Sequence, residues 1–98
     1  MIFPLTLHTG ANREMGEAAD YYRRVDPQLA ADLLTEIERS FQIIRERPKS
    51  CTVLAENTRR KMVHRFPYGI IFREHPGEIR ILAIAHLKRR PFYWAGRV

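Results

Sequence analysis

The chain of 98 residues is 45% hydrophobic and 29% charged, with a formal net charge of +6 at pH 7 and one cysteine. This length allows a single domain, residues 1–98, whose longest aliphatic run (81–85) is far shorter than the roughly 20 residues of a membrane-spanning helix. The lone cysteine excludes an internal disulfide and residues 1–10 carry no signal-peptide pattern, so we expect a cytoplasmic protein with no membrane partner.

The first half of the chain predicts a short strand followed by two helices. Residues 2–8 are β-rich but contain a proline that cannot donate to a strand ladder, so we expect an edge or irregular strand. From Ala11 the apolar residues recur at helical spacing. Asp26 followed by Pro27 is a good N-cap and first-turn pair, and it begins a second amphipathic helix that ends before Pro48. The two segments therefore predict a helical hairpin.

Most of the second half consists of three β-rich runs, at residues 59–66, 68–75 and 78–86. Short turns separate these runs, which favours antiparallel pairing of neighbours. Residues 48–58 have no strong period and are expected to form a loop. The predicted fold class is α+β: an antiparallel sheet of about four strands with the N-terminal helical hairpin on one face and basic residues on the other.

The positive charge is concentrated in the second half of the sequence. Residues 1–49 hold 7 Lys or Arg and 8 Asp or Glu, whereas residues 50–98 hold 10 and 3, which gives net charges of −1 and +7. This asymmetry indicates a polyanionic partner or an acidic protein that covers the same surface. The residues expected to bind a nucleic acid or another target are Arg59, Arg60, Lys61, Lys88, Arg89, Arg90 and Trp94.

Several of these residues also have a purely structural interpretation. Cations at positions 59–61 would protect an exposed edge strand from aggregation. Trp94 is expected to fold back onto the sheet, because a small domain needs its large apolar side chains, although aromatics beside cations also stack on bases. His86 ends the last strand and either acts as an acid or base or helps to turn the chain. The Tyr93 hydroxyl either stays in water or reaches a reacting phosphate.

The acidic residues of the first helix and the cysteine are expected to have no chemical role. Glu14, Glu17 and Asp20 are interpreted as an exposed helical face with i,i+4 ion pairs. Cys51 has no nearby activator, and the four histidines have no paired ligand spacing with it. We therefore expect neither a metal site nor a cofactor.

Three stretches carry a more specific pattern. They are EAADYYRRVDPQLAADLLTEIERSFQIIRERP (17–48), RFPYGIIFR (65–73) and ILAIAHLKRRPFYW (81–94). In this order, and over residues 11–97 as a whole, they resemble the ParE/RelE superfamily of toxins from type II toxin–antitoxin systems. The resemblance implies the order of strands and helices along the chain, β-α-α-β-β-β, that the periodicity also predicts.

The resemblance implies a growth inhibitor that a cognate acidic antitoxin neutralises, within a toxin–antitoxin hetero-oligomer. ParE-like poisoning of DNA gyrase, which is not enzymatic, is favoured. The alternative is a RelE-like endonuclease that cleaves mRNA on the ribosome, in which Arg65 and Arg73 would clamp phosphate, His86 would act as acid or base, and Tyr93 would support them. The second alternative is a non-toxic nucleic-acid-binding module, for which the charge asymmetry alone suffices.

Overall fold

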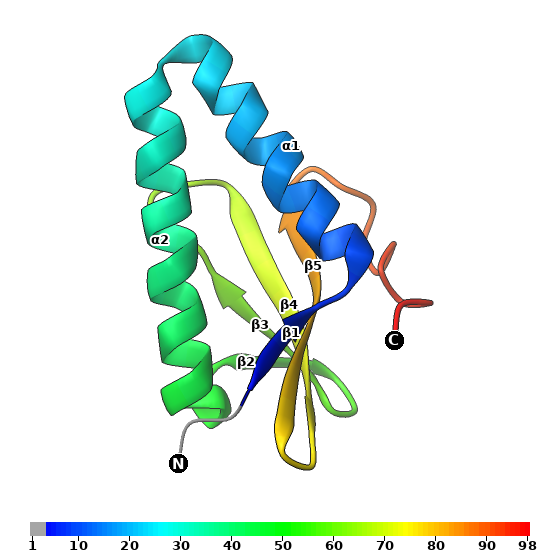
Figure 1. The fold of residues 1–98 in the computed structure, drawn as a ribbon. Coiled ribbons are helices and arrows are strands. Elements are labelled where there is room, and N and C mark those ends of the chain that lie inside the picture. The colour runs from blue at the N-terminus through cyan, green and yellow to red at the C-terminus, as the bar shows by residue number, and fades with distance from the viewer. Residues whose placement is uncertain (1–3) are drawn as a thin grey trace.

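Two layers, a helix pair and a five-stranded sheet, make up the computed structural model, which describes residues 4–98 (Figure 1). The elements are β1 (Leu5–Leu7), α1 (Thr9–Val25), α2 (Pro27–Glu46), η1 (Pro48–Ser50), β2 (Thr52–Ala55), β3 (Thr58–Met62), β4 (Tyr68–His75) and β5 (Glu78–His86). The strand order across the sheet is β1-β5-β4-β3-β2. Within residues 4–98, neither helix is long and apolar enough to cross a membrane.

The predicted antiparallel pairing is confirmed for β3, β4 and β5. β2, where a loop was expected, also pairs with β3 in antiparallel fashion, and β1 adds a parallel strand to the sheet. Leu5 lies opposite Ile79 and Leu7 opposite Ile81 on β5. Tight turns force neighbouring strands to run antiparallel, whereas β1 is separated from β5 by the whole helical hairpin and is free to pair in parallel. The sheet is therefore mixed and has five strands where about four antiparallel ones were expected.

Two other boundaries differ from the sequence-based expectations. The predicted loop at 48–58 contains η1 and β2, whose residues are mostly exposed and so carry no burial pattern. The predicted strand at 59–66 ends at Met62, and Arg65 beyond it has a φ of +75°, which no strand residue adopts. Residues 2 and 3 of the predicted first strand lie outside the described residues.

Both helices begin at local caps. The His8 Nδ1 accepts a hydrogen bond from the Gly10 amide at 2.9 Å, which satisfies one of the free donors of α1. The Asp26 carboxylate accepts from the Gln28 amide at 2.9 Å, and Pro27 occupies the first turn of α2. The cap predicted from the sequence is therefore confirmed.

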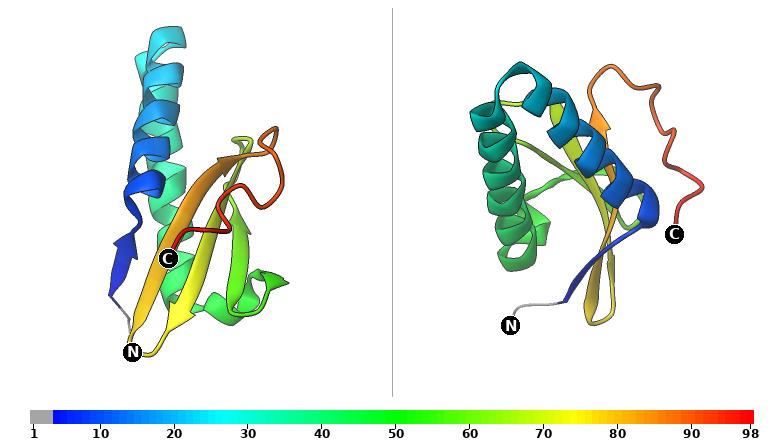
Figure 2. Two further views of the ribbon diagram at one scale, coloured as in Figure 1. Left: turned by 90° about the vertical axis from the view of Figure 1, so that its right-hand side faces the viewer. Right: turned by 45° about the horizontal axis from the view of Figure 1, so that its top comes forward.

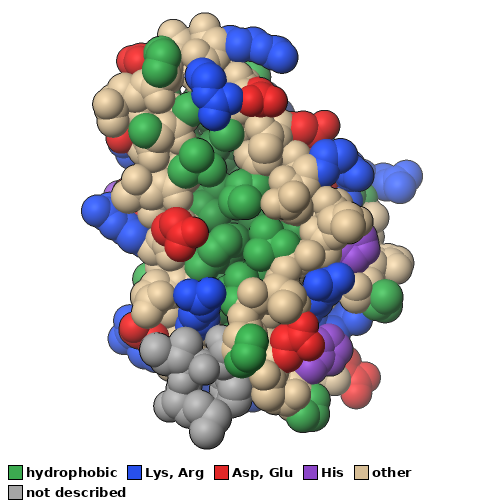
Figure 3. Space-filling view, viewed as in Figure 1, with side chains coloured by type: hydrophobic (Ala, Val, Ile, Leu, Met, Phe, Trp, Pro, Cys, Tyr) green, Lys and Arg blue, Asp and Glu red, His purple; other side chains and the backbone are tan. Residues whose placement is uncertain are grey.

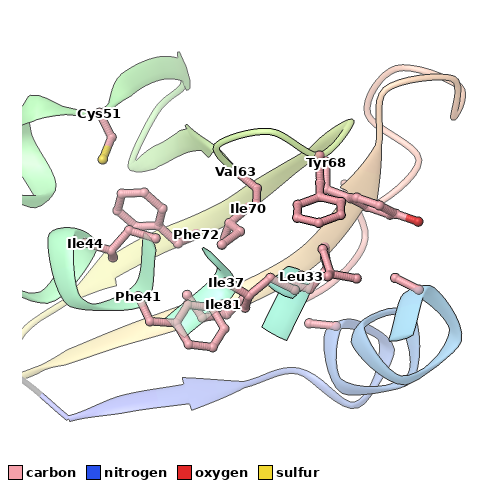
Figure 4. Packing of buried hydrophobic residues seen from close by; sticks show 14 of the residues in the cluster. Leu33, Ile37, Phe41, Ile44, Cys51, Val63, Tyr68, Ile70, Phe72 and Ile81 are labelled. Atoms are coloured by element: carbon pink, nitrogen blue, oxygen red, sulfur yellow. The ribbon is translucent and has the colours of Figure 1, made fainter. Parts of the chain in front are cut away.

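The main core lies between the helices and the sheet. Figure 4 shows Leu33, Ile37 and Ile44 of α2 directed toward side chains of the sheet. Their partners include Ile70 and Phe72 of β4, both fully buried. Burial of such side chains contributes about 1.5–3 kcal/mol each, so this layer supplies most of the apolar stabilisation.

A second, smaller core lies on the face of the sheet away from the helices. There the segment Leu87–Val98, hereafter the C-terminal arm, folds back across the strands (Figure 2, left view). Trp94 of the arm packs on Ile71, Leu82 and Ala83 and is 5% exposed. The expected packing of Trp94 onto the sheet is therefore confirmed.

Candidate functional site

The basic run on β3 is divided between the two faces of the sheet. Arg60 lies opposite Ile71, whose side chain is on the face away from the helices. Arg59 and Lys61 lie opposite Phe72 and Ile70, on the helix face. The expectation that the basic residues share the face opposite the helices is therefore wrong for Arg59 and Lys61, because side chains alternate along a strand.

Arg59 and Lys61 are engaged in local contacts. The Arg59 guanidinium donates to the Cys51 carbonyl at 3.0 Å, and its Nε lies 3.5 Å from a Glu74 carboxylate oxygen. The Lys61 ammonium donates to the Met62 carbonyl at 3.0 Å. The Arg59 contacts tie Cys51, which precedes β2, and the end of β4 to β3. The interpretation of these cations as protection for an exposed edge strand is wrong, because β3 lies inside the sheet between β4 and β2.

The two arginines expected to clamp a phosphate have different hydrogen-bond partners, Asp32 for Arg65 and Thr58 for Arg73. Arg65 is in the turn before β4, where its Nη1 donates to Asp32 of α2 at 3.0 Å. Hydrogen bonds from the Gln28 side chain and from Arg65 lower the pKa of Asp32. Arg73 lies five residues along β4 from the Tyr68–His86 pair, which corresponds to roughly 16 Å of strand.

His86 has the geometry of a turn-forming residue. Its Nδ1 accepts from the Lys88 amide at 3.0 Å, and its ring meets the Tyr68 ring edge-on at a centroid distance of 5.1 Å. Because Nδ1 is the acceptor, the neutral ring carries its proton on Nε2. The Lys88 side chain is exposed at the start of the arm.

A pocket of about 190 Å³ lies between the sheet and the C-terminal arm. Apolar side chains line much of it, among them Leu54, Ile71, Ala85, Leu87, Phe92 and Trp94. Arg60, Arg89 and Arg90 also line it, and no Asp or Glu does within the described chain. The Arg60 Nε is buried there without a hydrogen-bond partner. The pocket therefore suits a partner that is both apolar and negatively charged.

The Arg60 side chain passes close over Gly69, its diagonal neighbour on β4, which leaves it room to reach this pocket. A Cβ on Gly69 would lie 3.0 Å from the Arg60 Cδ, so any larger residue would displace the arginine side chain. The sequence offers no separate signal for this contact, because the two residues are neighbours only through strand pairing.

Glu14 differs most from its sequence-based interpretation. The charge pattern predicts an exposed carboxylate, but Glu14 is 6% exposed and accepts hydrogen bonds from Tyr93, Arg97 and the Ile84 amide. A signal is present in the sequence, because Glu14 shares the helical stripe of Ala11 and Ala18, both of which are buried. Its carboxylate therefore belongs to the interior.

The Tyr93 hydroxyl is held by Glu14 at 2.7 Å. Burial and the adjacent Glu14 carboxylate raise the pKa of Tyr93 well above the usual value for tyrosine. The same carboxylate raises the pKa of Arg97. Among residues 4–98, no three His, Cys, Asp or Glu side chains come together in a way that could hold a metal ion.

Comparison with known proteins shows which fold this is. The chain is similar to one in a solved structure described as "Chromosomal ParDE TA system from P. aeruginosa", with a TM-score of 0.76 and 19% sequence identity. The similarity covers 89% of this chain and 98% of that chain. No family model matches the sequence, and a search of curated proteins finds no match. The chain therefore has a RelE/ParE-like fold, as its sequence predicted.

Proposed function

We propose that this protein is the toxin of a toxin–antitoxin pair and inhibits growth in the cytoplasm by binding DNA gyrase, as ParE-like toxins do. The observation that carries the proposal is the near-complete structural likeness to a chain of a ParDE system. The charge of +7 in the second half of the chain supports it, since such a surface attracts a negatively charged partner.

The geometry favours binding over catalysis. Arg65 and Arg73, which a nuclease would need beside His86, are engaged elsewhere, with Asp32 and Thr58 respectively. The Tyr93 hydroxyl is directed to Glu14, and its raised pKa opposes proton transfer near neutral pH. His86 and Tyr93 line the same pocket, but Arg65 and Arg73 do not line it and bond to other residues.

The cognate partner in this proposal is an acidic antitoxin. Charge complementarity would direct its carboxylates to the pocket of Arg60, Arg89 and Arg90. Its apolar side chains would also find a hollow of about 340 Å³ between α1 and α2, lined by Met15 and Leu34 among others. Figure 3 shows apolar side chains gathered between the two helices.

Expression of the chain without a partner tests this proposal. We expect growth to stop, with DNA breaks and an induced SOS response, and with protein synthesis continuing at early times. The matched control is the double charge reversal Arg60→Glu with Arg90→Glu, which should abolish growth arrest while circular dichroism shows a folded protein. Normal growth in the presence of soluble, folded wild-type protein would contradict the proposal.

RelE-like cleavage of mRNA is the second candidate, and one observation favours it. His86 lines the same pocket as Arg60, Arg89 and Arg90, so an acid or base there would have guanidinium groups close by. Early loss of amino-acid incorporation with cut transcripts would support this candidate over gyrase poisoning. His86→Ala should then reduce toxicity by orders of magnitude and leave the melting temperature almost unchanged. A protein that binds nucleic acid without any toxicity would instead be a simple binding module.

A further inference from the structure

Glu14 connects α1 to the C-terminal arm across most of the sequence. Its Oε1 accepts from the Arg97 Nη1 at 2.8 Å, and its Oε2 accepts from the Arg97 Nη2 at 3.1 Å and from the Tyr93 hydroxyl at 2.7 Å. The paired contact with Arg97 is the bidentate geometry that fixes orientation as well as distance. Arg89 adds a more distant contact, 3.9 Å from Oε2.

The same two side chains complete an open edge of the sheet. β1 pairs with β5 only as far as Ile81, so within residues 4–98 the second half of β5 has no strand on that side. There the Ile84 amide donates to the Glu14 Oε1 at 3.1 Å, and the Leu82 carbonyl accepts from the Arg97 Nη1 at 2.9 Å. Glu14 and Arg97 therefore satisfy backbone groups that would otherwise be buried without partners.

Two neighbouring contacts are compatible with the position of the Arg97 guanidinium and help to hold the arm. A Cβ on Gly10 would lie 2.6 Å from the Arg97 Cζ, so a side chain at this position would push the guanidinium away. The Arg89 guanidinium stacks on the Tyr93 ring at 3.9 Å, which connects the start of the arm to its middle. The arm is thus fixed by contacts at both of its ends.

A buried carboxylate is costly unless it is paired, and buried pairs contribute little net stability compared with apolar packing. Their effect is to favour one geometry, since only one position of the arm satisfies both carboxylate oxygens together with the edge of β5. We propose that Glu14 is the positioning residue of the C-terminal arm, which it holds on the sheet so that Arg89 and Arg90 line the pocket. The inference rests on the proposed function only where it assigns target binding to this arm.

Trp94 reports on the position of the arm, because it is the only tryptophan in the chain and, as a residue of the arm, is 5% exposed where it packs on the sheet. In Glu14→Gln the amide would direct donor hydrogens at Arg97 or Tyr93, so we expect the arm to detach at 25 °C. Trp94 emission should shift to longer wavelength and its acrylamide quenching should rise at least threefold. The far-UV circular dichroism should stay that of the folded core.

The matched control is Glu17→Gln, one turn further along α1. The Glu17 side chain is 68% exposed, and its ion pair with Arg13 is 3.9 Å long. This variant should leave Trp94 quenching at the wild-type value. Arg97→Gln removes the same contact from the side of the arm and serves if Glu14→Gln does not fold.

Amide hydrogen exchange separates positioning from a general loss of stability. Positioning predicts a much larger increase in exchange in residues 87–98 and at the Ile84 amide than in α2, which belongs to the main core on the other face of the sheet. A merely stabilising role would accelerate exchange throughout the core and leave Trp94 shielded at 25 °C. Shielded Trp94 in both Glu14→Gln and Arg97→Gln would overturn the inference.

Growth inhibition, measured in parallel, separates this inference from the proposed function. If Trp94 becomes exposed and toxicity falls tenfold or more, the result supports both the positioning role of Glu14 and the proposed function. An exposed Trp94 with full growth arrest supports the role of Glu14 but overturns the assignment of target binding to the arm. If the wild-type chain does not arrest growth, the proposed function fails, while fluorescence still decides whether Glu14 positions the arm.

Discussion

A single residue type can have opposite environments one turn apart on the same helix. Glu17 is solvated, whereas Glu14 is buried and connects α1, β5 and the C-terminal arm. Composition alone does not separate the two, because both are acidic residues on an amphipathic helix. What distinguishes them is the supply of donors from residues more than 65 positions later in the chain. The chemistry of a side chain is therefore set by the partners that folding brings to it.

Tyr93 provides a test at the scale of the residue. Because burial and Glu14 raise its pKa from an ordinary value near 10.0, the unfolded chain ionises before the folded one. The stabilisation is fully present below that value and is lost as the pH rises from there toward the folded pKa. We expect the wild type to lose stability more steeply above pH 10 than Tyr93→Phe does, in urea titrations at a series of pH values.

Tyr93→Phe should retain a smaller alkaline dependence, since burial also raises the pKa of Tyr22 and of Tyr68. Equal slopes for the wild type and the variant would show that Tyr93 ionises freely in the folded protein.

Among the elements, the helices and the first strand, as an edge strand, were predictable, whereas β2 and the parallel pairing of β1 were not. The two helices follow from apolar periodicity and from the cap at Asp26, both of which are local in sequence. The antiparallel order of β3, β4 and β5 follows from their short turns. The strand β2 is exposed, and the parallel pairing of β1 depends on residues more than 70 positions away. Neither feature leaves a local pattern.

Two glycines in open surroundings give opposite predictions at this scale. Gly77, in the turn between β4 and β5, has a φ of +74°, and a Cβ added there would meet no atom within 4 Å, so only backbone strain opposes a side chain. Gly77→Ala should destabilise the protein by about 1–2 kcal/mol. Gly16, equally open but within α1, should as alanine stabilise it by about 0.5–1 kcal/mol through helix propensity.

Chemical denaturation of both variants measures this pair of effects. If the free energy of unfolding changed by a similar amount and in the same direction in both variants, backbone conformation would not be what distinguishes the two positions.

At the scale of the whole molecule, the sheet has a core on each face, and the two are covered by different ends of the chain. The helical hairpin from the N-terminal half covers one face, and the arm covers the other (Figure 2). The +7 charge of the second half is consequently spread over both faces, with Arg60 beneath the arm and Arg59 on the helix side. One pocket concentrates three of these cations beside apolar side chains.

The second core predicts how much the arm contributes to stability. Trp94→Ala should cost about 3–5 kcal/mol, because it leaves Ile71 and Leu82 without their cover. Phe92, two residues earlier and 54% exposed, is the matched control and should cost less than about 1 kcal/mol as alanine. Thermal unfolding of the two variants measures the difference, and a small effect of Trp94→Ala would contradict a structural role for the arm.

The sequence by itself determined the features that follow from local patterns. These are the amphipathic helical hairpin, the antiparallel pairing of the last three strands, and the packing of Trp94 on the sheet. Its resemblance to known toxins also indicated the fold. Only the tertiary structure decided which face each cation occupies, that Glu14 is buried, and that Arg65 and Arg73 bond to Asp32 and Thr58. The physical reason is that periodicity specifies whether a side chain faces inward or outward, whereas hydrogen bonds and ion pairs depend on strand register and on residues distant in the chain.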